Sequence, residues 1–175
     1  MSEQQIKHPD SMKKISVSKV VINIGVGKSG EPIEKAKHAL HELTGQRPSV
    51  RGAKETIRDF GIHKGEPIGA MVTLRRQQAT EFLKRIIAAK SNVLKFSSFD
   101  SYGNISVGIH EHIDIPGTKY NPDIGIFGMD VSLSLTRPGY RIAKKRNRQK
   151  IGRAHRITKD EAIKYFQQQF GVEIA

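Results

Sequence analysis

The stretch ISVGIHEHIDI, from Ile105 to Ile115, alternates apolar and polar side chains more clearly than any other part of the chain. Such alternation is typical of a β-strand with one buried and one solvated face. We therefore expect a single strand over the whole stretch. Its apolar face carries Ile105, Val107, Ile109, Ile113 and Ile115, and its polar face carries Ser106, Gly108, His110, His112 and Asp114.

Three other segments have the same two-faced pattern and are also predicted to be strands. Strands of this kind form an antiparallel sheet that is covered on one side only. The inward side chains are Val20, Ile22 and Ile24 in residues 14–27, Ala70, Val72 and Leu74 in residues 68–75, and Met129, Val131, Leu133 and Leu135 in residues 129–135.

Helices with one apolar stripe each are predicted to cover the apolar side of this sheet. The first has Pro32 in its first turn and stops at Gly45. The last begins with a capping box from Thr158 to Glu161. Their apolar stripes are Ile33, Ala36, Leu40 and Leu43 in the first helix, Phe82, Leu83, Ile86 and Ile87 in the second, and Ile163, Phe166 and Phe170 in the last.

The predicted fold class is therefore α+β, an open-faced antiparallel sheet with helices on one side. It is RRM-like in outline and has a basic C-terminal extension. Its 175 residues suit a single domain over 1–175. Two glycine-rich segments, Pro48 to Pro67 and Pro116 to Phe127, have no clear period. Loops of that length in a compact domain are often functional.

The charge pattern points to a polyanionic partner. The formal net charge is +13, and no Asp or Glu occurs from Val131 to Lys159. Nucleic acid is the strongest candidate, because each phosphate contact releases condensed counterions. We predict an RNA-binding segment at residues 137–157, with contacts from Arg137, Arg141, Lys144, Lys145, Arg146 and Arg148.

Several other classes of protein are excluded or disfavoured by composition. The chain has no cysteine, which excludes disulfides and thiol catalysis. No apolar run is long enough to span a membrane, and residues 1–14 have no apolar signal core. A basic cytoplasmic protein without catalytic residues, cofactor, metal or membrane partner is expected.

Gly25 to Gly30 matches the G-x-G-x-x-G dinucleotide fingerprint between a strand and a helix. The acidic residue that should follow after about twenty residues is absent, since Gly45 to Val50 contains no acid. A nucleotide-dependent enzyme is therefore disfavoured against a tight glycine turn. An interpretation between these two is that backbone N–H groups of this turn hold an RNA phosphate.

Titratable residues give no convincing catalytic or metal site. His110 and His112 form an H-x-H pattern, but a zinc site needs further convergent ligands. We expect both histidines to face solvent or RNA. Asp100, Glu111 and Asp114 are interpreted as surface charges, because no nucleophile or apolar pocket accompanies them.

Several ordered stretches of the chain form a recognisable set. They are Lys19 to Gly27 (KVVINIGVG), Leu43 to Pro48 (LTGQRP), Ile57 to Arg75 (IRDFGIHKGEPIGAMVTLR), Glu81 to Arg85 (EFLKR), Phe99 to Ile113, and Ile126 to Asp130 (IFGMD). Taken together, they resemble the ribosomal large-subunit protein five family, the 5S-rRNA-binding protein of the central protuberance. The ending RPGYR, Arg137 to Arg141, followed by basic residues, is similar to the archaeal and eukaryotic-type branch.

The resemblance implies a structural constituent of the large ribosomal subunit, located in the cytoplasm. It implies as partners 5S rRNA, large-subunit rRNA, P-site tRNA, neighbouring proteins of the central protuberance and a small-subunit head protein across an intersubunit bridge. The implied 5S rRNA contacts are Asn23, Gln46 and Thr73, with Arg75 and the first helix nearby. The implied tRNA-facing loop runs from Arg51 to His63 and takes its charge from Arg51, Lys54 and Arg58.

The main alternative is a non-ribosomal RNA-binding or RNA-chaperone module with the same basic surface. Stoichiometric co-purification with ribosomes separates the two interpretations.

The exposed face carries no aromatic positions of the kind on which RNA recognition modules stack bases. It is therefore expected to meet RNA through hydrogen bonds that read shape.

Overall fold

The computed structural model describes residues 11–175, and the expected absence of a signal peptide falls largely outside these residues. The helices are α1 Glu31–Thr44, α2 Arg76–Ala89 and α3 Lys159–Phe170. The strands are β1 Ser16–Gly25, β2 Ser49–Gly52, β3 Pro67–Leu74, β4 Val93–Leu94, β5 Ile105–Ile109, β6 Met129–Thr136 and β7 Glu173–Ile174. Short 3₁₀ turns are η1 Ser11–Lys13, η2 Arg58–Phe60, η3 Phe96–Ser98, η4 His112–Asp114, η5 Tyr140–Lys144 and η6 Arg153–His155.

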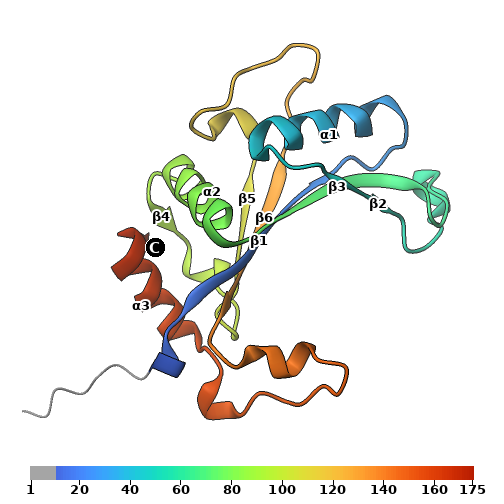
Figure 1. Ribbon diagram of the computed structural model, residues 1–175. Coiled ribbons are helices and arrows are strands. Elements are labelled where there is room, and N and C mark those ends of the chain that lie inside the picture. Colours follow the sequence, from blue (N-terminus) through green and yellow to red (C-terminus); the bar gives the residue numbers. More distant parts are fainter. Residues whose placement is uncertain (1–10) are drawn as a thin grey trace, which may run out of the picture.

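Five strands form one sheet in the order β2-β3-β1-β6-β5, and every neighbouring pair is antiparallel. The predicted antiparallel sheet is confirmed. β1 lies at its centre, hydrogen-bonded to β3 on one side and to β6 on the other. Figure 1 shows the long strands crossing the molecule with the three helices gathered on one side of them.

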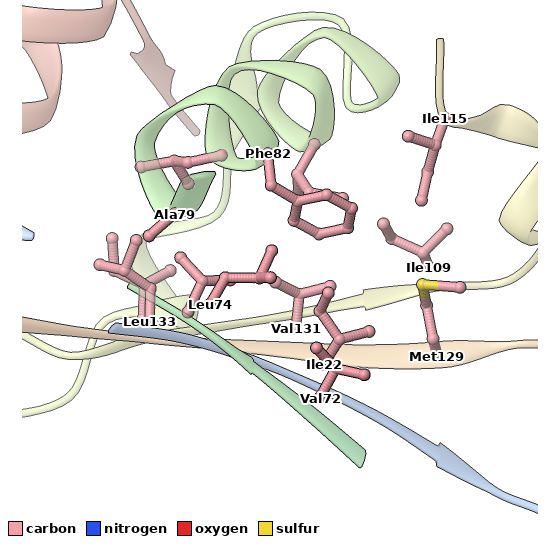
Figure 2. Packing of buried hydrophobic residues seen from close by; sticks show 14 of the residues in the cluster. Ile22, Val72, Leu74, Ala79, Phe82, Ile109, Ile115, Met129, Val131 and Leu133 are labelled. Carbon is pink, nitrogen blue, oxygen red and sulfur yellow. The ribbon is translucent and has the colours of Figure 1, made fainter. Parts of the chain in front are cut away.

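The core lies between the apolar face of the sheet and the helices, as the alternating pattern predicts. Val20, Ile22 and Ile24 of β1 are fully buried. Figure 2 shows Phe82 of α2 lying over the apolar side chains of the strands, among them Val131. Burying an aliphatic or aromatic side chain of this size contributes roughly 1.5–3 kcal/mol. This one-sided core leaves the opposite face of the sheet open.

The predicted helix ends are confirmed where the sequence carries specific signals. Pro32 stands in the first turn of α1, and Gly45 ends the helix with a left-handed φ of 66°. Both halves of the capping box form at α3, between Thr158 and Glu161. In α3, Phe166 is fully buried, whereas Ile163 and Phe170 are only half-buried.

The strand predicted from Ile105 to Ile115 is wrong in its second half. Its partner β6 begins at Met129, which pairs with Ile109, so residues beyond Ile109 have no strand to pair with. The chain turns there instead, and residues 112–114 form η4. The turn places His112 inside the protein, with 3% of its surface exposed. The expectation that His112 faces solvent or RNA is therefore wrong.

The basic stretch is an internal segment of the fold, because the chain returns to the core after it. α3 packs Phe166 against Phe99, with ring centroids 5.9 Å apart. β7 then pairs in parallel with β4. Within residues 11–175, no helix is both long and apolar enough to cross a membrane.

Candidate nucleic-acid interface

The open face of the sheet presents two rows of side chains that run across the strands. Thr73, Val21, Ser132 and Ser106 occupy successive paired positions of one row. The next row contains Met71, Asn23, Asp130 and Gly108. Two predicted contact residues, Asn23 and Thr73, thus lie on one face of adjacent strands in neighbouring rows.

The other residues predicted to contact 5S rRNA lie off this face. The Gln46 side-chain amide donates a hydrogen bond to Gln78 of α2, which places Gln46 beside the helices. Arg75 is exposed and forms the N-cap position of α2, directly after β3. The predicted set therefore curves around the end of β3 from the open face towards the helix layer.

Of the residues predicted to face tRNA, Arg51 lies in β2, and Lys54 and Arg58 lie in the loop between β2 and β3. Arg51, Lys54 and Arg58 are all exposed. Phe60 at the turn η2 is also exposed, with 74% of its surface accessible. In Figure 1 the loop extends beyond the sheet as a projecting arm. Its charged side chains are therefore available to a partner.

Hydrogen bonds give this loop a defined shape. Ile57 and Ile62 exchange two backbone hydrogen bonds of 2.9 and 3.1 Å. Glu66 accepts a bond from the His63 backbone at 2.8 Å and one from the Ser29 hydroxyl at 2.6 Å. These two bonds hold the pKa of Glu66 below its usual value. The two ends of the loop approach closely at Gly52. A Cβ at this position would lie 2.9 Å from the Gly65 carbonyl oxygen, so a larger residue would not fit there without a shift.

The basic segment, residues 137–157, presents most of its cations to solvent. Within residues 11–175, none of these exposed side chains forms an ion pair with an Asp or Glu. Uncompensated charge of this density attracts a polyanion. The exposed cations are Arg141, Lys144, Lys145, Arg146, Arg148, Lys150 and Arg153.

Arg137 differs from the rest of the segment, and its predicted contact with rRNA does not fit the structure. Only 5% of the residue is exposed. Its guanidinium donates a 2.8 Å bond to the Glu161 carboxylate and a 3.4 Å bond to the His155 backbone carbonyl. The side chain is occupied in joining the basic segment to α3, so it is not available to RNA.

The glycine turn after β1 does not form a nucleotide site. Both neighbours of β1 are antiparallel to it, whereas the dinucleotide fold requires parallel strands. The backbone N–H groups of Val26 and Gly27 both donate to the Ile68 carbonyl at 2.9 Å. Those two groups are therefore not free to hold a phosphate, and the intermediate interpretation also fails for them.

The two histidines of the H-x-H pattern have different environments. His110 is exposed, as predicted. Burial lowers the pKa of the His112 imidazole, while the charge of Glu42 acts in the opposite direction. The Phe127 backbone N–H donates to His112 Nδ1 at 3.3 Å, which requires an unprotonated Nδ1. Among the described residues, no three His, Cys, Asp or Glu side chains are arranged to hold a metal.

Asp100 has a role that the sequence analysis missed. Its Oδ1 accepts hydrogen bonds from the backbone N–H groups of Tyr102 and Asn104, at 2.8 and 2.7 Å. Its Oδ2 accepts a 2.7 Å bond from the Asn104 side chain. The carboxylate therefore organises a turn before β5. An Asp followed by Ser, Gly and Asn is a turn signal, and residues 100–104 carry that composition.

Comparison with known proteins identifies relatives over nearly the whole chain. Residues 10–63 match the family model described as Ribosomal protein L5, and residues 67–165 match the model for the C-terminus of the same ribosomal family. Both matched segments contribute strands to the same five-stranded sheet, since β1 and β2 lie in the first and β3, β5 and β6 in the second.

Individual relatives are about equally similar to this chain. Large ribosomal subunit protein uL5 of Sulfolobus acidocaldarius is 52% identical over 175 residues, which is 99% of this chain and 98% of the relative. The same protein of Nitrosopumilus maritimus is 53% identical over 94% of this chain and 95% of its own length. That of Pyrobaculum aerophilum is 54% identical over 95% of this chain and 93% of its own length.

Proposed function

This chain belongs to the ribosomal protein L5 family, and from that membership we propose that it binds 5S rRNA and helps to attach it in the central protuberance. As a member of the family it is a structural, non-enzymatic constituent of the large subunit of the cytoplasmic ribosome. We further propose contacts with P-site tRNA and with a small-subunit head protein. Residues 1–175 act in this proposal as one unit.

The exposed positive charge of the basic segment is the main observation that supports RNA binding. The basic segment exposes seven cations that have no acidic partner within residues 11–175. A surface of this kind gains free energy when condensed counterions leave the RNA backbone. We assign Arg141, Lys144, Lys145, Arg146 and Arg148 to large-subunit rRNA. Arg137 is left out because it is buried and paired with Glu161.

The open face is proposed to meet 5S rRNA by hydrogen bonding. Asn23 and Asp130 are paired residues on adjacent strands, so a carboxylate lies beside the amide. A phosphate would be repelled by Asp130, whereas a ribose 2′-hydroxyl or a base amino group can donate to it. We therefore propose that Asn23 and Thr73 contact sugars or base edges, while Arg75 and the cations outside the face contact phosphates.

The loop from Arg51 to His63 is proposed to contact P-site tRNA. It extends past the end of β1 at which Gly25 pairs with Gly69, and the basic segment follows the opposite end, where Ser16 pairs with Thr136. At about 3.3 Å per residue, the two ends of this strand are roughly 30 Å apart. That separation supports different RNA partners for the two surfaces.

The test is a binding measurement with purified protein and 5S rRNA over a range of salt concentrations. We expect affinity to fall with a log–log slope of roughly 0.7–0.9 per phosphate contact. An unrelated RNA of the same length should bind more weakly at physiological salt. Equal affinity for the two RNAs would contradict selective 5S binding.

A second arm of this experiment tests the basic segment. Neutralising Lys144, Lys145 and Arg146 together should lower incorporation into large subunits in cells. The matched control neutralises three exposed lysines at or near the helix layer, Lys84, Lys95 and Lys164. Equal incorporation of the two triple variants would remove the basic segment from the proposal.

A further inference from the structure

The basic segment and the end of the sheet enclose a cleft of about 530 Å³. Its floor includes Lys19 of β1 and Ser134 of β6, which are paired residues on the open face. Its walls include Tyr102 from the turn before β5, and Tyr140 and Lys144 from η5. In Figure 1 this is the end of the molecule where the basic segment, in orange, continues from β6. The volume lies within the range of about 300–1,000 Å³ found for small-molecule sites.

Tyr102 is held on a rigid support although its ring is open to solvent. The residue is 60% exposed. Its backbone N–H is bound to the Asp100 carboxylate, which also fixes Asn104. Gly103 packs so closely that a Cβ there would lie 2.7 Å from the Ile157 side chain. The turn therefore presents an aromatic ring at little cost in conformational entropy on binding.

Tyr140 is fixed by two hydrogen bonds at its hydroxyl. The oxygen accepts a 2.8 Å bond from the Ile157 backbone N–H and donates a 3.2 Å bond to the His155 carbonyl. Its ring also contacts the His155 ring edge-to-face, with centroids 5.7 Å apart. Two tyrosines from separate elements are thus held in place around one cleft.

The positive charge of the cleft favours an anionic ligand. Its lining includes Lys19, Lys144 and Arg156, and no Asp or Glu. Arg156 uses Nε to bind the Ile151 carbonyl at 3.1 Å, so its position is also fixed. The nearby Asp100 carboxylate is occupied by its own turn. Polar groups of Ser18, Asn104 and Ser134 complete the lining with donors and acceptors.

We propose that this cleft receives a single unstacked nucleotide of large-subunit rRNA. The base stacks on Tyr102, the phosphate lies against Lys144 and Lys19, and the polar groups of the floor bind the sugar or base edge. Aromatic rings beside cations form the usual platform for unpaired bases in RNA-binding proteins. This inference rests on the proposed RNA-binding function and adds to it a site for one extruded base.

The test compares full-length variants in binding to a short unstructured oligoribonucleotide and to an RNA duplex of equal length. Tyr102→Ala should weaken single-strand binding roughly 10-fold, because a stacking partner is lost. Its duplex affinity and its salt dependence should be unchanged. Tyr102→Phe should bind as the wild type does. Lys144→Ala should weaken binding to both RNAs and reduce the log–log salt slope by about 0.7–0.9.

Tyr120→Ala is the matched control, since Tyr120 is 57% exposed and lies in a different surface loop. It should leave both affinities unchanged. A second measurement is ultraviolet crosslinking of the wild-type protein to large-subunit rRNA, followed by mass spectrometry. The crosslinked nucleotide should map to the peptide that contains Tyr102.

The outcomes separate this inference from the proposed function. Three results would overturn the nucleotide site alone, provided that the wild-type protein binds RNA. Tyr102→Ala could leave single-strand affinity unchanged, or it could weaken single-strand and duplex binding equally. The crosslinks could also map only to peptides that do not contain Tyr102. Equal weakening by Tyr102→Phe and Tyr102→Ala would also overturn it, because the ring would then not be the binding element. Failure of the wild-type protein to bind the oligoribonucleotide while it still binds 5S rRNA would also overturn the nucleotide site alone, whereas failure to bind 5S rRNA would overturn the proposed function.

Discussion

The Glu161 carboxylate joins the basic segment to the last helix. One oxygen accepts a 3.0 Å bond from the Thr158 backbone N–H, and the other accepts a 2.8 Å bond from Arg137. Burial alone would raise the pKa of Glu161. The bonds from Thr158 and Arg137, together with the Arg137 charge, outweigh burial and hold this pKa below its usual value.

Glu161→Gln should destabilise the protein at pH 7 by roughly 1–2 kcal/mol. This figure allows for the partial exposure of the carboxylate, whose side chain is 42% accessible. Because the folded-state pKa is depressed, the stabilisation is complete above the unfolded value of about 4.3 and is lost as pH falls through the folded value. Urea unfolding from pH 7 to pH 3 should therefore show wild type and variant converging in acid.

The control for this experiment is Glu55→Gln, an exposed carboxylate in the loop between β2 and β3. It should follow the wild-type curve throughout. A constant gap between Glu161→Gln and wild type over the whole pH range would show that the carboxylate charge is not the source of the stabilisation.

His112 should make stability depend on pH in a different range. Its folded-state pKa is lowered by burial, so below its unfolded value of about 6.5 the unfolded chain binds a proton that the folded chain does not. Stability should then fall as pH decreases from 7 to 5.5. His112→Leu should flatten this part of the curve relative to wild type. His110→Leu, at an exposed neighbour, should keep the wild-type slope, and identical slopes for both variants would contradict the assignment.

Thr73→Val should weaken binding to 5S rRNA while keeping the fold, because only the hydroxyl on the open face is lost. An unpaired buried partner on the RNA would cost on the order of 1–3 kcal/mol. Thr80→Val is the matched control, since Thr80 is similarly half-exposed but lies on α2. Filter binding and thermal melting together measure the effect. Equal affinity of the two variants for 5S rRNA would remove Thr73 from the interface.

At the scale of elements, the long segments were predictable from sequence because each has a strong period and a specific end signal. β6 alternates over its whole length, β1 from Lys19 and β3 from Ala70 onward, and Gly45 marks the end of α1. The same rule failed beyond Ile109, where alternation continues although β6 offers no partner. Pairing across the chain, which no local pattern contains, decides where that strand stops.

The short elements could not be predicted for a related reason. β4 and β7 have two residues each, too few to show a period. They pair with each other although about eighty residues separate them in the sequence. Among the site residues, the exposure of Arg51, Lys54 and Arg58 follows from local composition. The burial of Arg137 does not, because it depends on Glu161 in a helix that begins more than twenty residues later.

The loop between β2 and β3 should not be needed for binding to 5S rRNA. Deleting residues 58–61 removes η2 and the exposed Phe60 but leaves the paired positions of β2 and β3 intact. Affinity for 5S rRNA should stay within about twofold of wild type, since Asn23, Thr73 and Arg75, the residues proposed to contact it, lie outside the deleted residues. Ribosomes carrying the deletion should release P-site tRNA faster. Unchanged release rates would mean that the loop merely connects two strands.

At the scale of the whole molecule, the fold separates three surfaces that differ in chemistry. The helices cover the apolar side of the sheet, the open face offers hydrogen-bonding groups, and the cations gather in the basic segment and the loop beyond β2. A small protein with surfaces at both ends of its central strand suits a position between several RNA elements. Its net charge of +13 favours such contacts over isolation in solution.

We propose that the open face serves 5S rRNA within the large subunit and that the basic segment holds large-subunit rRNA. The most direct measurement is to purify the protein from cells under mild salt and to sequence the RNA that accompanies it. We predict 5S rRNA in near-stoichiometric amount, together with large-subunit rRNA. Recovery of a mixture of unrelated RNAs without enrichment of 5S rRNA would contradict the account.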